Sequence, residues 1–230
     1  MLAGIRSVVS QPQQVPQAPP TWQTRFAQHD DKVPCVDWLL ACCCTPCASS
    51  AAKSHVDRSS LLYNFLCWNP IATHSYVRHA YHIDGVCGDD LMYGLFCMPC
   101  TVRQMYTESN LRGPIPGNFG ANQGDWAHSL FDCSVPEMLD TICCVWCITH
   151  TIRKQLQPST EENYCFFDMC CLLPFAMYGQ VRHTYGIISD VSLCEDICVP
   201  VVCWPCALNR AKKETIARCG GAVKSAYQRA

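Results

Sequence analysis

Two halves of this chain carry the same sequence features in the same order, and this constrains the fold more than any other property. Val77–Ile83 reads Val-Arg-His-Ala-Tyr-His-Ile, and Val181–Ile187 reads Val-Arg-His-Thr-Tyr-Gly-Ile, 104 residues later (182 − 78 for the arginines). Repeats settle an architecture before any single element does, so the order predicts two diverged copies of one module. Other matched features are Trp22 and Trp126, Cys44/Cys47 and Cys144/Cys147, Cys97/Cys100 and Cys203/Cys206.

Composition divides the chain into five segments. Residues 1–21 form a Gln- and Pro-rich arm with no face that could pack. Glycine and proline cluster at 112–125, which predicts a linker near the middle of the chain. We therefore expect one cysteine-rich module at 22–111 and a second at 126–221, followed by a basic tail at 222–230.

The predicted fold class is mostly α. β-branched residues and strict alternation are too scarce for a sheet-built domain. We expect three helical segments in each module. The internal prolines Pro46, Pro70, Pro99, Pro174, Pro200 and Pro205 should each kink or split the helix that contains them. Ser134 and Ser192 begin capping-box patterns that mark helix starts. The expected ranges are 36–54, 59–80 and 89–110 in the first module, and 135–157, 160–184 and 192–217 in the second.

Charge and apolar content indicate a membrane surface rather than a nucleic acid as partner. Charged residues make up only 16% of the chain and apolar residues 49%, whereas soluble domains are about a quarter charged. A net charge of −2 gives no support for nucleic-acid binding. The longest run without charges, Ser59–Val77, contains too many polar residues for a good span. Short apolar runs beside cysteines suit a chain that lies on or dips into a bilayer, and equally a buried helical core.

The cysteine count indicates a reducing environment. An odd total of 21 leaves at least one thiol unpaired, and the start of the sequence has no apolar stretch typical of a signal peptide. We therefore expect the cysteines to face the cytosol, on a protein attached to the plasma membrane or an endomembrane.

The repeated pattern resembles the placenta-specific-eight cysteine-rich family, which includes onzin, cornifelin and the plant cadmium-resistance proteins. The resemblance covers about 22–110 and 126–221. Both halves depart from the family, because its usual Cys-Pro-Cys in the first cluster is replaced by Thr-Pro-Cys and Val-Trp-Cys. The matching residues are Trp22, Cys43, Cys47, Arg78, Tyr81, Asp90, Cys97, Pro99, Cys100 and Glu108, then Trp126, Phe131, Cys133, Cys143, Cys147, Arg182, Tyr185, Asp196, Cys203, Pro205, Cys206 and Glu214.

This resemblance implies a non-enzymatic, membrane-associated protein that associates with copies of itself. Plant members influence divalent metal handling and organ growth, and animal members are linked to growth and differentiation. The residues themselves also favour a protein that is not an enzyme. They contain no Gly-rich phosphate loop, no His-Glu-x-x-His and no nucleophile elbow.

Four Cys-x-x-Cys pairs supply the candidate metal ligands. Two pairs in one half provide four thiolates, the set that tetrahedral Zn²⁺ takes, and positions three apart share one face of a helix. Other states stay open for these cysteines: buried thiols that pack as small apolar groups, disulfides, or acylated thiols. The candidate zinc ligands are Cys44, Cys47, Cys97, Cys100, Cys144, Cys147, Cys203 and Cys206.

Palmitoylation is a further expectation, because cysteines beside apolar runs at a membrane surface can carry acyl chains. Candidate clusters are Cys42–Cys44, Cys143–Cys144 and Cys170–Cys171. The basic C-terminal end from Arg210 onward fits either an anionic leaflet or a solvated helix end.

Arg78 and Arg182 occupy matched positions in apolar surroundings. Intramembrane charges of a transporter are one interpretation. We favour ion pairs with Asp90 and Asp196, which also occupy matched positions.

Three functions follow as hypotheses. The leading one is a membrane-associated regulatory or scaffold protein linked to divalent metal homeostasis. The second is a soluble zinc-stabilised module that binds other proteins, with one closed site in each half. The third is a homo-oligomeric component of a metal transport pathway.

Overall fold

The computed structural model describes residues 21–24, 26, 35–115, 125–156, 174–187 and 192–218. Within these ranges the chain is helical and has no β-strand, which confirms the mostly α fold class. The helices are α1 (Cys35–Cys43), α2 (Thr45–Asp57), α3 (Leu61–Cys67), α4 (Pro70–Ala80), α5 (Cys87–Phe96), α6 (Met98–Arg112), α7 (Val135–Cys143), α8 (Val145–Leu156), α10 (Pro174–Thr184), α11 (Ser192–Val202) and α12 (Trp204–Arg218).

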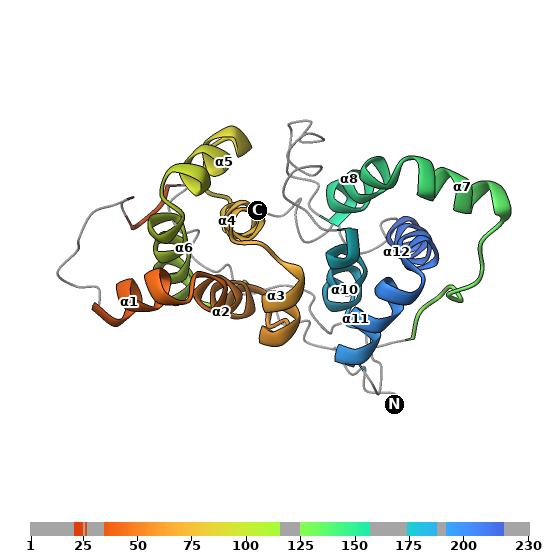
Figure 1. Ribbon diagram of the computed structural model, residues 1–230, viewed down its shortest axis with the longest axis horizontal. Coiled ribbons are helices and arrows are strands. Elements are labelled where there is room, and N and C mark those ends of the chain that lie inside the picture. Colours follow the sequence, from red (N-terminus) through yellow and green to blue (C-terminus); the bar gives the residue numbers. More distant parts are fainter. Residues whose placement is uncertain are drawn as a thin grey trace, which may run out of the picture.

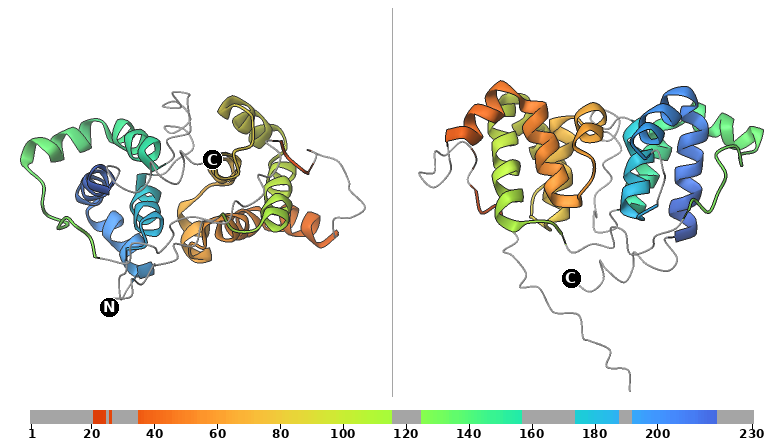
Figure 2. Two further views of the ribbon diagram at one scale, coloured as in Figure 1. Left: turned by 180° about the vertical axis from the view of Figure 1, so that it is seen from behind. Right: turned by 90° about the horizontal axis from the view of Figure 1, so that it is seen from below.

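The helices form two groups that lie side by side along the long axis of the molecule (Figure 1). The N-terminal helix group contains α1 to α6, and the C-terminal helix group contains α7, α8, α10, α11 and α12. In the right-hand view of Figure 2 helices α2, α6, α10 and α12 stand roughly upright. Helices α1, α7 and α11 lie at the upper ends of these helices in that view.

Prolines divide most of the expected helices. Pro46, Pro70 and Pro99 each lie in the first turn of a new helix, where a missing backbone N–H costs nothing. The expected helix 36–54 is thereby split into α1 and α2, 59–80 into α3 and α4, and 89–110 into α5 and α6. Pro200 is the exception, because it lies inside α11.

The described part of the second half also contains helix breaks, but not all of them fall at a proline. The expected helix 192–217 breaks before Pro205, but 135–157 breaks into α7 and α8 with no proline nearby. The capping box at Ser134 is present, since Ser134 and Glu137 bind each other's backbone N–H groups. Of the expected helix 160–184, only α10 falls within the described residues.

Within the described residues, no helix combines the length and apolar content that a membrane crossing requires.

The two helix groups meet through buried polar side chains as well as apolar ones. Lys53 is fully buried, with Nζ 2.5 Å from Asp57 Oδ2 and 2.8 Å from Gln180 Oε1 of the other group. The Tyr63 hydroxyl donates to the carbonyl of Ala176, and its ring lies against Gly179. Each group therefore provides hydrogen-bond partners or packing contacts for buried side chains of the other.

Candidate functional site

Four helix breaks share one backbone geometry, and we call each a corner. At the break between α1 and α2, the Cys44 N–H still bonds to the Leu40 carbonyl at 2.9 Å, while the Cys44 carbonyl accepts from Ala48 at 3.1 Å. Cys44 thus ends one helix and begins the next. The other corners, at Cys97, Cys144 and Cys203, have the same two backbone bonds.

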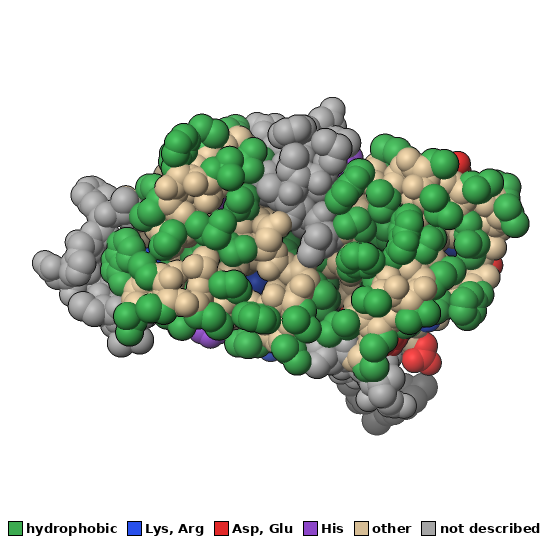
Figure 3. Space-filling model, viewed as in Figure 1, with side chains coloured by type: hydrophobic (Ala, Val, Ile, Leu, Met, Phe, Trp, Pro, Cys, Tyr) green, Lys and Arg blue, Asp and Glu red, His purple; other side chains and the backbone are tan. Residues whose placement is uncertain are grey.

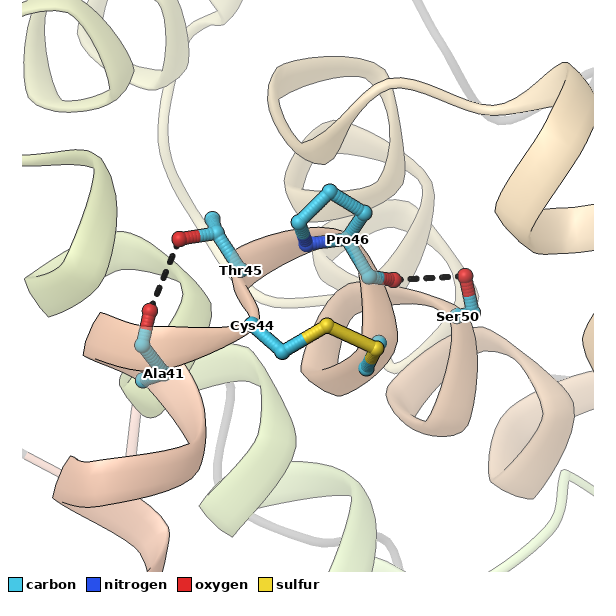
Figure 4. The surroundings of a disulfide bond; sticks show 6 residues. Ala41, Cys44, Thr45, Pro46 and Ser50 are labelled. Carbon is cyan, nitrogen blue, oxygen red and sulfur yellow. Dashed lines mark hydrogen bonds between the residues drawn. A yellow bond between two sulfur atoms is a disulfide. The ribbon is translucent and has the colours of Figure 1, made fainter.

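A disulfide closes each corner. Cys44 bonds to Cys47, one turn into α2, while the Thr45 hydroxyl donates to Ala41 and that of Ser50 to Pro46 (Figure 4). The remaining pairs are Cys97–Cys100, Cys144–Cys147 and Cys203–Cys206.

The structure therefore brings together the two cysteines of every predicted pair. Among the described residues, no group of three or more His, Cys, Asp or Glu side chains is placed to hold a metal ion. Because disulfide sulfur does not supply a thiolate, zinc binding by the eight cysteines stays a prediction for the reduced chain.

Arg78 and Asp90 form a buried ion pair, as expected from their matched surroundings. Arg78 Nε lies 2.9 Å from Asp90 Oδ2, and Arg78 also donates to the Gly85 carbonyl at 2.6 Å. His74 Nδ1 lies 2.8 Å from the second carboxylate oxygen. Burial alone would raise the pKa of Asp90, but the His74 hydrogen bond and the Arg78 charge outweigh it and hold the pKa below its ordinary value.

The C-terminal helix group contains the matching pair. Arg182 Nε lies 2.6 Å from Asp196 Oδ1, and His183 Nε2 lies 3.2 Å from Oδ2 of the same carboxylate. Burial raises the pKa of Asp196, whereas the hydrogen bonds from Arg182 and His183 lower it further than burial raises it. Both arginines are thus held in the protein interior by a carboxylate, which confirms the expected pairing.

Two buried glutamates fix the segments that begin each group. Glu108 accepts from the backbone N–H of Thr24 at 3.1 Å and from Arg112, and Trp22 stacks on His74 at 4.7 Å. In the other group, Glu214 accepts from Ala127 and Arg218, and Trp126 stacks on Tyr178 at 4.7 Å. Trp22, Glu108, Trp126 and Glu214, which occupy matched positions of the two halves, therefore fix these segments to the helices.

The residue before each corner is exposed. Phe96 precedes Cys97 and is 81% exposed, and Val202 precedes Cys203 and is 84% exposed. Cys43 and Cys143 occupy the same place at the other two corners and are exposed free thiols. Each corner thus has one exposed apolar side chain directly before it, and we call these four residues the tips.

Each helix that leads into a corner carries an exposed apolar stripe. On α7 the stripe is Val135, Leu139, Ile142 and Cys143, whose spacing of i, i+4, i+7 and i+8 places them on one side of the helix. Together with exposed α3 side chains, these stripes form what we call the apolar face. Its other members are Leu39, Cys42 and Cys43 of α1, Leu61, Leu62, Phe65 and Leu66 of α3, Met92, Leu95 and Phe96 of α5, and Cys194, Cys198, Val201 and Val202 of α11.

Figure 3 shows that apolar side chains cover much of one side of the molecule, over both helix groups. Few charged side chains interrupt them. Isolated exposed apolar residues are normal, but extended patches mark binding surfaces for proteins or membranes.

The basic C-terminal end is largely engaged within the protein. Arg210 donates to the carbonyl of His128 at 2.8 Å and stacks on Trp126, and Lys213 donates to the carbonyl of Asp132 at 2.6 Å. Arg218 pairs with Glu214. Two interpretations of the basic end were an anionic leaflet and a solvated helix end. The contacts favour neither, because these cations stabilise the fold. Lys224 and Arg229 lie outside the described residues.

The chain is not similar to any protein to which it was compared: no protein-family model, curated protein or solved structure matches it. The candidate site is therefore defined by its own geometry, which is the apolar face with the free thiols it carries.

Sequence reasoning missed part of this site. The stripe on α11 joins Cys194 and Cys198 to Val201 and Val202. Its helical spacing is visible in the sequence, but exposed and buried stripes have the same period. Of the predicted palmitoylation clusters, Cys44 and Cys144 are in disulfides, and Cys170–Cys171 lies outside the described residues.

Proposed function

We propose that the protein is a non-enzymatic scaffold that binds one leaflet of a membrane through the apolar face. The exposed tips Phe96 and Val202, each at the end of an apolar stripe, carry this proposal. Such a role agrees with the resemblance to the placenta-specific-eight cysteine-rich family, with two copies of its module in tandem.

The lengths of the helices favour an interfacial position. A helix of nine residues such as α1 or α7 is about 14 Å long, less than half the thickness of a hydrocarbon core. Short helices with one apolar side lie in the plane of the interface and bury that side among acyl chains. Tips at the four corners would enter deepest.

The buried ion pairs and the basic C-terminal residues are compatible with this orientation. Both Arg–Asp pairs are buried within the helix groups rather than on the apolar face. Because Arg210, Lys213 and Arg218 are engaged within the protein, we expect burial of apolar area, rather than attraction to anionic lipid, to provide most of the binding energy.

Vesicle flotation tests the proposal with the purified full chain. Phosphatidylcholine vesicles, with and without phosphatidylserine, should both carry the protein to the top of a density gradient. The double variant Phe96→Glu/Val202→Glu should reduce the floated fraction at least tenfold, since two charges at membrane depth are strongly unfavourable.

The chain offers a matched control for these substitutions. Leu111 and Ile216 are also exposed apolar residues, but they lie near the far ends of α6 and α12, about 20 Å along the helix from the corners. Leu111→Glu/Ile216→Glu should float like the native protein. Equal loss in both variants, or no flotation of the native chain, would contradict the proposal.

A second copy of the chain is the competing occupant of this face. In that case the native protein would elute as a dimer and stay at the bottom of the gradient, and Phe96→Glu/Val202→Glu would convert it to a monomer.

A further inference from the structure

Five exposed free cysteines lie in the stripes of the apolar face. Cys42 and Cys43 follow Leu39 by three and four positions on α1, so all three share one side of that helix. The remaining thiols are Cys143 on α7 and Cys194 and Cys198 on α11.

Their neighbours on each helix are apolar. Leu39 is 64% exposed, Ile142 precedes Cys143, and Val201 lies one turn after Cys198. On α11 the two sulfur atoms are 3.2 Å apart, so both thiols point to the same place. If the apolar face binds a leaflet, a thiol surrounded in this way would face the bilayer.

The other described cysteines differ in access or in chemistry. Cys67 and Cys87 are free but buried, and burial raises the pKa of the Cys67 thiol to about 11, so little of it is thiolate. The corner cysteines have no free thiol, because they form disulfides. Cys133 is a free thiol of intermediate exposure and lies outside the stripes. Among the free thiols that the structure describes, the exposed ones are therefore all on the apolar face.

We propose that Cys42, Cys43, Cys143, Cys194 and Cys198 are sites of S-acylation by long-chain fatty acyl coenzyme A, a proposal that rests on the proposed membrane function. The cysteine sulfur attacks the acyl carbonyl carbon, and the bond from that carbon to the coenzyme A sulfur breaks. Coenzyme A leaves as a thiol with the proton that the cysteine gives up, so no oxidant or reductant takes part.

The arrangement of the five thiols suits stable anchoring. One acyl chain gives only marginal, reversible membrane binding, whereas two hold a protein firmly. Cys42 and Cys43 are adjacent in the N-terminal helix group, and Cys194 and Cys198 lie one turn apart in the other group. Each helix group therefore has positions for two chains.

Acylation is measured on the full chain expressed in cells, by cleaving thioesters with neutral hydroxylamine and capturing the thiols released. The variant with all five cysteines replaced by serine should lose at least nine tenths of the hydroxylamine-dependent capture. As a control, Cys67→Ala/Cys87→Ala should keep the native level, because these thiols are buried.

Several outcomes would overturn the inference: no hydroxylamine-dependent capture of the native chain, or capture of the five-serine variant above half the native level. All five substitutions are at exposed positions, and circular dichroism of the purified variant checks that it folds. The pairs Cys42→Ser/Cys43→Ser and Cys194→Ser/Cys198→Ser, each made alone, should each lower capture at least 1.5-fold, as expected from about two sites of five.

Vesicle flotation separates this inference from the function on which it rests. Protein purified from bacteria carries no acyl chains, so its flotation depends on the apolar face alone. Flotation without capture in cells would remove acylation and leave the membrane function standing, whereas failure of flotation would remove the proposed function.

Discussion

Tyr76 and Gln180 hydrogen-bond to each other across the boundary between the two helix groups, and they are also matched positions of the two halves. Gln180 Nε2 lies 3.5 Å from the Tyr76 hydroxyl oxygen. The two residues stand 104 positions apart (180 − 76), as Arg78 and Arg182 do. Contact between matched positions is what a two-fold arrangement of like modules produces.

The first prediction tests how closely the two groups pack. A Cβ atom at Gly179 would lie 2.5 Å from the nearest ring atom of Tyr63, which real side chains do not tolerate. Gly179→Ala should therefore lower the free energy of unfolding by about 1–3 kcal/mol, as measured by urea denaturation. Gly88→Ala is the control, because nothing lies within 4 Å of its Cβ position. Equal stability of both variants would show that the groups can move apart without loss.

A second prediction concerns the buried cation at the same boundary. Lys53 is paired with Asp57 at 2.5 Å, and its Nζ lies 4.4 Å from the centroid of the Trp68 ring. Lys53→Met leaves the buried Asp57 carboxylate without its partner and should cost about 3–5 kcal/mol. The double variant Lys53→Met/Asp57→Asn should recover much of this loss in urea unfolding.

An exposed lysine provides the comparison. Lys154→Met, on the exposed side of α8, should change the free energy of unfolding by less than about 0.5 kcal/mol. A loss for Lys53→Met no larger than that for Lys154→Met would mean that the boundary is open to water.

A third prediction follows from the lowered pKa values of Asp90 and Asp196. Each carboxyl has an ordinary pKa of 3.8 when unfolded and a lower one when folded. As pH falls below 3.8, the unfolded chain therefore binds protons that the folded chain does not. The stability that these groups provide is fully present above pH 3.8 and is lost as pH falls through the folded pKa.

Substitution of one carboxylate should change that dependence. Asp196→Asn should be less stable near neutral pH by about 3–5 kcal/mol, because Arg182 stays buried without its partner, and should lose less further stability on acidification. Urea midpoints measured from neutral pH down to about pH 2 check both effects. Asp84→Asn, at an exposed position, should keep the native pH profile. An unchanged slope in Asp196→Asn would contradict the prediction.

The helix breaks at the corners show how much of the fold could be predicted from the sequence. Pro46, Pro99 and Pro205 led to correct breaks, because a residue without a backbone N–H fits the first turn of a helix better than its interior. Pro200, inside α11, did not produce a break. The break at Cys144 has no proline and was not predicted, since one helix was expected over 135–157. The pairing of Arg78 with Asp90 was predictable, since both halves preserve it.

The candidate site was less predictable. The exposed apolar residues of α3 and α7, such as Leu61, Phe65 and Leu139, repeat with the same helical spacing as core residues. Nothing local in the sequence distinguishes a stripe that faces another helix from one that faces outward. The difference arises because α2 packs on α6 in one group and α10 on α12 in the other, while α1, α7 and α11 lie at the ends of these helices. Only the position of α11 in the structure identifies Cys194 and Cys198 as part of the candidate site.

The last prediction concerns the corner disulfides. Each closes a loop with a sequence separation of only 3, and so short a loop restricts the unfolded chain little, by about 2 kcal/mol at most in the chain-entropy account. Cys44→Ala/Cys47→Ala should therefore keep cooperative unfolding, with a loss no larger than this. Cys203→Ala/Cys206→Ala should lose more, because the Cys206 side chain is buried and leaves a cavity. Urea unfolding of both variants, with and without a dithiol reductant, measures the difference. If reduction abolished cooperative unfolding of the native chain, the corners would depend on their disulfides rather than on the packing of the helices they join.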